Sequence, residues 1–176
     1  MPDTLAHYAL SYLVASRMVK PRYAVLFAPI GLLPDVDTVL RIHRWITHSL
    51  VFVAIIVLVG AIILNYYSPR HLEYILLATG LYVLHIITDV FTAATPILWP
   101  ITNQAYMFRI EIDGVITNHS VNIEPQIELI TKNADFTPKP VLEGPLITPV
   151  GIIVAVGTIA IIIIEIMKEN IVFKKQ

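Results

Sequence analysis

Cysteine is absent from this 176-residue chain, and charged residues are scarce. Without cysteine, neither disulfide bonds nor thiolate metal ligands can contribute to the fold or the chemistry. Charged residues make up 14% of the chain, whereas soluble domains contain about 25%. The formal net charge is −1, so we expect no basic surface for nucleic acid. The opening Met1-Pro2-Asp3-Thr4 lacks the positive segment of a secretory signal peptide, so we expect none.

Long apolar runs dominate the rest of the chain, which is 56% hydrophobic. We therefore predict an all-α membrane helical bundle with about four to five transmembrane or re-entrant helices. Pro29 and Gly31 interrupt the second apolar run, which favours a short broken helix inside the bundle. The predicted helices cover residues 4–19, 23–33, 46–64, 74–91 and 147–167.

Residues 101–145 have a different character. Apolar and polar residues largely alternate over 106–112, which predicts a strand, and the following Asp113-Gly114 is a common hairpin turn. We predict a small β-rich excursion outside the bilayer, with an irregular polar loop as the alternative. The predicted domains are a metal-site helical membrane core over 1–100, the excursion over 101–145, and a C-terminal transmembrane anchor helix with its tail over 146–176.

Ionisable residues gather at residues 33–50, between two apolar runs. The stretch contains two carboxylates and two imidazoles, Asp35, Asp37, His43 and His48. Such groups are costly in or beside hydrocarbon and usually mark a functional site. His85 and Asp89 are four residues apart, so they share one face of a predicted helix. Histidine and carboxylate together suit a divalent metal ion, for which zinc is our expectation, with one or two ions bound.

Each part of this pattern has an alternative explanation. His85 and Asp89 could hydrogen-bond to one another between helices, and Asp35 or Asp37 could cap a helix or form a turn. Capping uses one carboxylate, however, and leaves the second to be explained. The predicted metal ligands are His7, Asp35, His43, His48, His85 and Asp89.

Two further residues are predicted to take part in catalysis. Asp37 is expected to act as a ligand or as a general base. Arg44 carries a permanent charge whose planar fork suits a phosphate or carboxylate oxygen; the alternative is a structural carboxylate partner such as Asp37. Thr47 and Ser49 are expected to hydrogen-bond the ligands.

Lysine and arginine placement predicts the orientation of the helices. If the helices alternate in direction, most positive residues outside the polar stretch share one end of the bundle, which we expect to be cytoplasmic. These residues are Lys20, Arg22, Arg70, Lys168, Lys174 and Lys175. The metal site and the β excursion are then expected on the extracytoplasmic side, although Arg41 and Arg44 oppose the rule.

The polar residues, taken in order, resemble one known family. His7, Leu33-Pro34-Asp35-Val36-Asp37, His43-Arg44-x-x-Thr47-His48-Ser49 and His85-x-x-x-Asp89 are similar to the membrane-bound metal-dependent hydrolases called inner-membrane or YdjM-like. The resemblance covers residues 1–100 and implies a divalent-metal hydrolase. One position departs, because Trp45 stands where the family commonly has glycine. A weaker similarity to zinc-dependent phospholipases C rests on His85 and Asp89.

The expected function is metal-dependent hydrolysis of a lipid or lipid-linked phosphoester at the membrane surface. A divalent ion supplies an activated water and polarises the scissile group, and the expected partner is a membrane lipid. One alternative is a non-catalytic membrane protein whose metal or polar cluster is structural, and another is a metal-ion transporter. The oligomeric state is left open.

Overall fold

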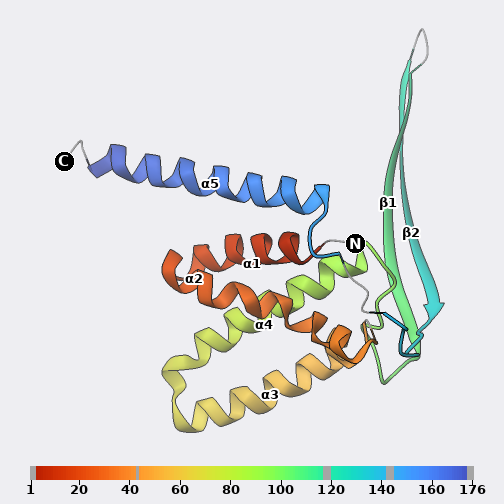
Figure 1. Cartoon of the computed structure of the whole chain (residues 1–176), viewed down its shortest axis with the longest axis horizontal. Coiled ribbons are helices and arrows are strands. Elements are labelled where there is room, and N and C mark those ends of the chain that lie inside the picture. Colours follow the sequence, from red (N-terminus) through yellow and green to blue (C-terminus); the bar gives the residue numbers. More distant parts are fainter. Residues whose placement is uncertain (1–2, 43, 117–119, 142–144, 174–176) are drawn as a thin grey trace.

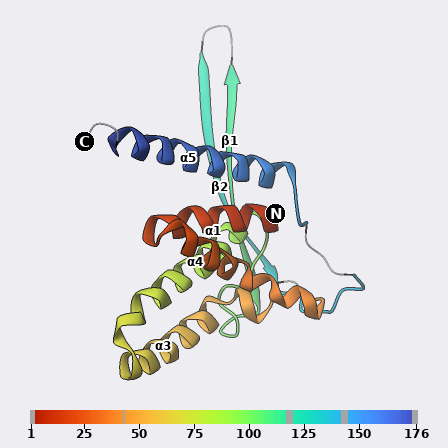
Figure 2. The same ribbon diagram turned by 60° about the vertical axis from the view of Figure 1, so that its left-hand side comes forward.

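The chain folds as a helical bundle from which one long β-hairpin projects (Figures 1 and 2). The structure is a computed structural model and describes residues 3–42, 44–116, 120–141 and 145–173. In chain order, its elements are α1 (Thr4–Met18), α2 (Pro21–Phe27), η1 (Ala28–Leu40), η2 (Ile46–His48), α3 (Leu50–Tyr67), η3 (Pro69–His71), α4 (Leu72–Val90), β1 (Gln104–Ile116), β2 (Val121–Asn133) and α5 (Pro149–Phe173). The predicted helical class and the predicted strands within residues 101–145 are confirmed, whereas the number of membrane-spanning helices and the location of the strands outside the bilayer stay predictions.

Among the described residues, three helical segments are long and apolar enough to cross a membrane, namely Pro21–Leu40, Leu50–Tyr67 and Pro69–Val90. A fourth apolar stretch, Pro149–Ile164 in α5, is shorter. The side chains of α3 are mostly exposed, as Ile55, Leu58 and Ile62 illustrate. Exposed apolar side chains of this kind are stable beside lipid, so the chain is a membrane protein.

The second apolar run extends further than the sequence predicts. It does not end near Leu33 but continues from α2 as the 3₁₀ helix η1 to Leu40, which together make a 20-residue candidate span. Pro29 and Pro34 have no N–H group for an α-helical hydrogen bond, which accounts for the tighter 3₁₀ geometry of η1.

The third helix begins later than predicted. Ser49 accepts a hydrogen bond from the Phe52 backbone N–H at 3.2 Å and so caps α3, which starts at Leu50 rather than at residue 46. Residues Ile46–His48 form the separate 3₁₀ turn η2. His48 therefore lies in a turn before the helix instead of in its first turn.

Small residues let α1, η1 and α4 approach closely. Ala15, Ala24, Leu77 and Leu81 form one buried cluster. Gly31 of η1 lies so close to α1 that a side chain at this position would overlap Ser11. α1 also packs along α5 (Figures 1 and 2), where the Asp3 side chain caps α1 through the Ala6 N–H and also bonds the Thr148 N–H.

The hairpin is a two-stranded antiparallel ribbon, and its turn lies beyond the predicted position. Asp113 and Gly114 are not the turn but belong to β1, where they pair with Glu124 and Ile123 of β2. The pairing register continues to Ile116 and Val121. A turn dipeptide can occupy a strand when cross-strand pairs on both sides extend the ladder.

The hairpin has an apolar face and a polar face. Phe108, Ile110 and Ile112 alternate along β1 with their partners Leu129, Ile127 and Pro125 on one face, and the isoleucines are largely exposed. Arg109 and Glu128 pair on the other face. The base is joined to the bundle through two backbone hydrogen bonds of 2.9 Å between Thr95 and Tyr106.

Candidate metal centre

Four buried or half-buried aspartate and histidine residues converge at one end of the bundle. Asp35 comes from the end of η1, His48 from η2, and His85 and Asp89 from the last turns of α4. One ligand atom from each residue lies within 4.8 Å of the others. Because α2–η1, α3 and α4 alternate in direction, these four residues, which are far apart in sequence, meet at the same end.

His85 is oriented by a backbone carbonyl. Its Nδ1 lies 2.7 Å from the Gly31 oxygen, and since a carbonyl only accepts, Nδ1 carries the proton. The Nε2 atom then carries the lone pair, and it lies 3.4 Å from Asp35 Oδ1. Metal-binding histidines are commonly held in this way, with one nitrogen donating to an oxygen and the other facing the ion.

His48 is held between carboxylates and is fully buried. Its Nδ1 lies 3.2 Å from Asp37 Oδ2, while Nε2 lies 3.5 Å from Asp89 Oδ2 and 3.7 Å from Asp35 Oδ1. Burial lowers the pKa of His48, but hydrogen bonds and charge from Asp37 and Asp89 outweigh burial and raise the pKa above its ordinary value. Both histidines therefore direct Nε2 toward the carboxylates of the cluster.

Asp37 contacts the Nδ1 side of His48, whereas Asp35 and Asp89 lie on its Nε2 side. Its Oδ2 accepts hydrogen bonds from the Trp45 N–H and the Thr47 hydroxyl, each at 2.6 Å. This geometry suits a carboxylate that orients His48 and fastens the following loop. The role of Asp37 as a ligand or general base stays a prediction. Of the two predicted supporting hydroxyls, Thr47 bonds Asp37, whereas Ser49 bonds the Trp99 carbonyl oxygen and caps α3.

His7 lies beside the four-residue cluster. Its ring stacks on His85 with 3.8 Å between centroids, and its Nε2 lies 3.4 Å from Asp89 Oδ1. Thr88 Oγ1 is 3.3 Å from His7 Nδ1. The predicted His7 thus reaches the site from the first turn of α1, while the predicted ligand His43 lies outside the described residues.

Arg44 forms an ion pair with Asp89. Its Nε donates to Asp89 Oδ2 at 2.7 Å, so the carboxylate partner is Asp89 where the sequence suggested Asp37. The buried Nη2 atom has no hydrogen-bond partner among the described residues. Arg44 also adopts a left-handed backbone with φ of 60°, which costs free energy in a non-glycine residue and is frequent at functional sites.

Three contributors to the site were missed by sequence reasoning. The Gly31 carbonyl could not be found, because a backbone oxygen leaves no signature in the residue type. Thr88 and Tyr82 flank His85 along α4, and Tyr82 donates a 2.6 Å hydrogen bond to the Thr47 carbonyl. Helical spacing from His85 places Tyr82 on the same face of α4, and that signal was available.

The donor set suits a divalent cation. Two carboxylates and two imidazole nitrogens are ligands used by zinc and by other first-row metals. Two carboxylates close together in a buried space are unfavourable when their charge is not compensated. A dication would offset that charge. The cluster could therefore hold a metal ion through Asp35, His48, His85 and Asp89. The donor set does not specify which metal.

Comparison with family models extends the resemblance beyond the polar motifs. The model described as YdjM inner membrane protein matches residues 3–170, which include the hairpin and most of α5. Comparison with curated proteins gave no match, and comparison with solved structures gave none. The match covers nearly the whole chain, and the chain therefore belongs to the YdjM inner membrane protein family.

Proposed function

We propose that this protein is a divalent-metal-dependent hydrolase that acts on a lipid or lipid-linked phosphoester. The observation that carries the proposal is the convergence of Asp35, His48, His85 and Asp89 at one end of a membrane bundle. When bound there, a zinc-like ion would supply an activated water and polarise the scissile group. The side chains of the cluster would hold the ion, and Asp37 and the Gly31 carbonyl would keep the two imidazoles in place.

Unequal exposure of the cluster supports a catalytic site rather than a closed structural one. The side chain of Asp35 is 27% exposed, whereas those of His48, His85 and Asp89 are at most 2% exposed. A catalytic metal site keeps an open position, and a structural site is closed. The Asp35 side is therefore the side from which water and substrate would reach the ion.

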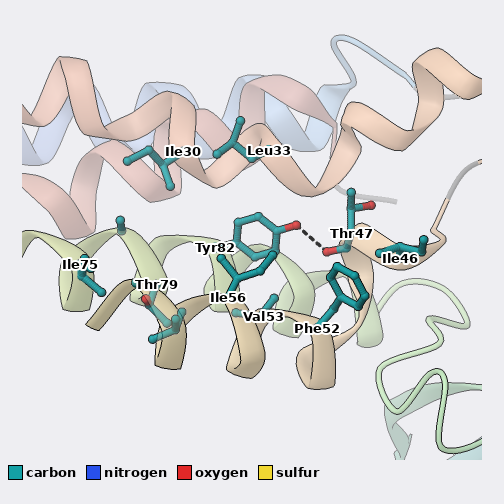
Figure 3. A pocket seen from close by; sticks show the side chains of 13 residues that line it. Ile30, Leu33, Ile46, Thr47, Phe52, Val53, Ile56, Ile75, Thr79 and Tyr82 are labelled. Atoms are coloured by element: carbon teal, nitrogen blue, oxygen red, sulfur yellow. Dashed lines mark hydrogen bonds between the residues drawn. The ribbon is translucent and has the colours of Figure 1, made fainter. Parts of the chain in front are cut away.

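An apolar groove supports a lipid as substrate. It has a volume of about 470 Å³ and lies among η1, α3 and α4 (Figure 3). Its walls are almost wholly hydrocarbon, with Val53, Ile56 and Ile75 among them, and Thr47 lines one end. Thr47 precedes His48 and bonds Asp37, so the groove ends beside the cluster. Because α3 and α4 are candidate membrane spans, we propose that a lipid chain occupies the groove.

The second candidate function is a structural cluster that joins the helices. Near-complete burial of His48, His85 and Asp89 favours this alternative. In that case the free energy of metal binding would be part of the free energy of folding. Loss of one ligand should therefore reduce mainly turnover if the site is catalytic and mainly stability if the cluster is structural.

The substitution Asp35→Asn separates the two functions. It keeps the shape of the side chain but removes a charge from the most exposed ligand. If the site is catalytic, phosphoester turnover should fall at least ~100-fold, because a weakened ion no longer activates water, and the melting temperature in detergent should change little. Asp113→Asn on the exposed hairpin is the matched control and should keep full turnover. Strong destabilisation by chelator with no turnover in either protein would contradict the hydrolase and favour the structural cluster.

A further inference from the structure

We infer that the base of the hairpin and Arg44 form an anion-binding pocket for the phosphate group of the substrate. The inference deepens the proposed function, on which its link to catalysis rests. It also assigns a purpose to the hairpin, which the metal centre leaves unexplained. The ligand chemistry is a phosphate monoester or diester, which could belong to a lipid headgroup or to free phosphate.

The pocket is a cavity of about 210 Å³ beside the metal centre. Small residues, Ala94, Pro96 and Ala105, shape part of its wall. The remaining lining residues include three cations against one carboxylate, namely Arg44, Lys132, Lys139 and Asp135. An excess of positive charge in a small concave space raises the local concentration of anions.

Arg44 connects this pocket to the metal centre. Its Nε is committed to Asp89 at 2.7 Å, while its buried Nη2 donor has no hydrogen-bond partner among the residues that the structure describes. Leaving a charged donor buried without an acceptor is costly. A phosphate oxygen would satisfy it, because the guanidinium fork suits phosphate geometry. An anion held by Arg44 would thus lie next to a ligand of the ion.

The lysines are positioned by backbone contacts at the base of the hairpin. The Lys139 N–H donates to the Arg41 carbonyl at 2.8 Å, which ties the return segment to the loop before Arg44. Lys132 pairs with Ala105 across the ladder. Trp45 contributes to the same junction, since its ring lies 6.4 Å from that of Phe136. Trp45 thus links the loop that carries Arg44 to the segment that follows β2.

Asp135 limits the strength of the pocket. Its side chain accepts hydrogen bonds from Thr137 and from Lys139 Nζ, the latter at 3.1 Å. These bonds lower the pKa of Asp135 to about 2, so the carboxylate is charged at neutral pH. The Asp135 carboxylate therefore neutralises part of the positive charge of Lys139. Removal of the negative charge of Asp135 should strengthen anion binding. Substitution of Asp135 and substitution of the lysines should therefore change the anion affinity in opposite directions.

The test measures anion binding by titration calorimetry in a nonionic detergent, with no turnover required. The two probes are inorganic phosphate and dihexanoyl phosphatidic acid. The double substitution Lys132→Gln/Lys139→Gln should weaken binding of both by on the order of tenfold, the effect of losing a charge-assisted contact. Asp135→Asn should strengthen binding. Arg109→Gln is the control, since it removes a cation from the same hairpin outside the pocket, where Arg109 pairs with Glu111 and Glu128.

The two probes distinguish the sources of the phosphate. Tighter binding of phosphatidic acid than of inorganic phosphate would indicate a lipid headgroup. Equal affinities would indicate that the pocket recognises the phosphate group alone. Either result supports the pocket if the lysine double variant binds the probes more weakly than the wild type. Equal binding by wild type and the lysine double variant would overturn the inference, even if the protein hydrolyses phosphoesters. Lysine-dependent binding without turnover would uphold the pocket and contradict the hydrolase.

Discussion

At the scale of single residues, Gly31 connects packing to the metal centre. Its carbonyl orients His85, and its missing side chain lets η1 approach α1. In Gly31→Ala the new methyl group would overlap Ser11, lying 2.9 Å from its Cβ. Since η1 must then move, we predict a loss of about 1–3 kcal/mol in stability together with weaker zinc binding.

Melting temperature and zinc affinity of the purified variant measure these two effects. Gly80→Ala is the matched control, because a Cβ at this helical position meets no described atom within 4 Å beyond its chain neighbours and the backbone of its own helix, and it should keep wild-type zinc affinity. Reduced stability with unchanged zinc affinity in Gly31→Ala would show that the carbonyl does not position His85.

The polar residues of the site were predictable from sequence where their spacing is local. His85 and Asp89 share a helix, so four-residue spacing alone places them on one face. The pairing of Arg44 with Asp89 joins residues 45 positions apart, and no local pattern specifies it. Asp35 contacts Nε2 of His85 and Asp37 contacts Nδ1 of His48, because η1 directs their side chains differently. The spacing of two nearby aspartates does not specify these directions.

At the scale of elements, the hairpin and the α3–α4 turn lie at opposite ends of the bundle (Figure 1). Positive residues near that turn, such as Arg70, favour a cytoplasmic location for it, so we propose an extracytoplasmic hairpin and metal site. Cysteine introduced as Glu124→Cys in β2 should react with a membrane-impermeant maleimide in intact cells. Arg70→Cys should react only after lysis.

Because the chain has no native cysteine, each variant carries a single label site. Both Glu124 and Arg70 are exposed, so lysed cells should label both variants and provide the control for accessibility. Labelling of the Arg70 variant alone in intact cells would reverse the orientation and place the metal site in the cytoplasm.

The helices were more predictable from sequence than the connections. Long apolar runs predict α1, α3, α4 and α5, and the candidate membrane spans α3 and α4 must in addition satisfy their own backbone hydrogen bonds within lipid. The continuation of η1 to Leu40 and the position of the hairpin turn were not predicted. Both depend on tertiary contacts and strand pairing, which override the local preferences of proline, glycine and aspartate.

At the scale of the whole molecule, alternating helices bring distant polar residues to one end. The first turn of α1, the end of η1, the turn η2 and the end of α4 all meet there. The bundle thus gathers these ionisable side chains at one end, and such groups in or beside hydrocarbon usually mark a functional site. We therefore propose that this site binds a divalent metal ion.

Elemental analysis of the purified protein after incubation with zinc and removal of excess metal tests this claim most directly. The wild type and the Asp113→Asn control should each retain at least about one zinc ion per chain, whereas Asp35→Asn should retain far less, because the site loses a charged ligand. Zinc content near zero in the wild type, or equal content in wild type and Asp35→Asn, would contradict the metal centre.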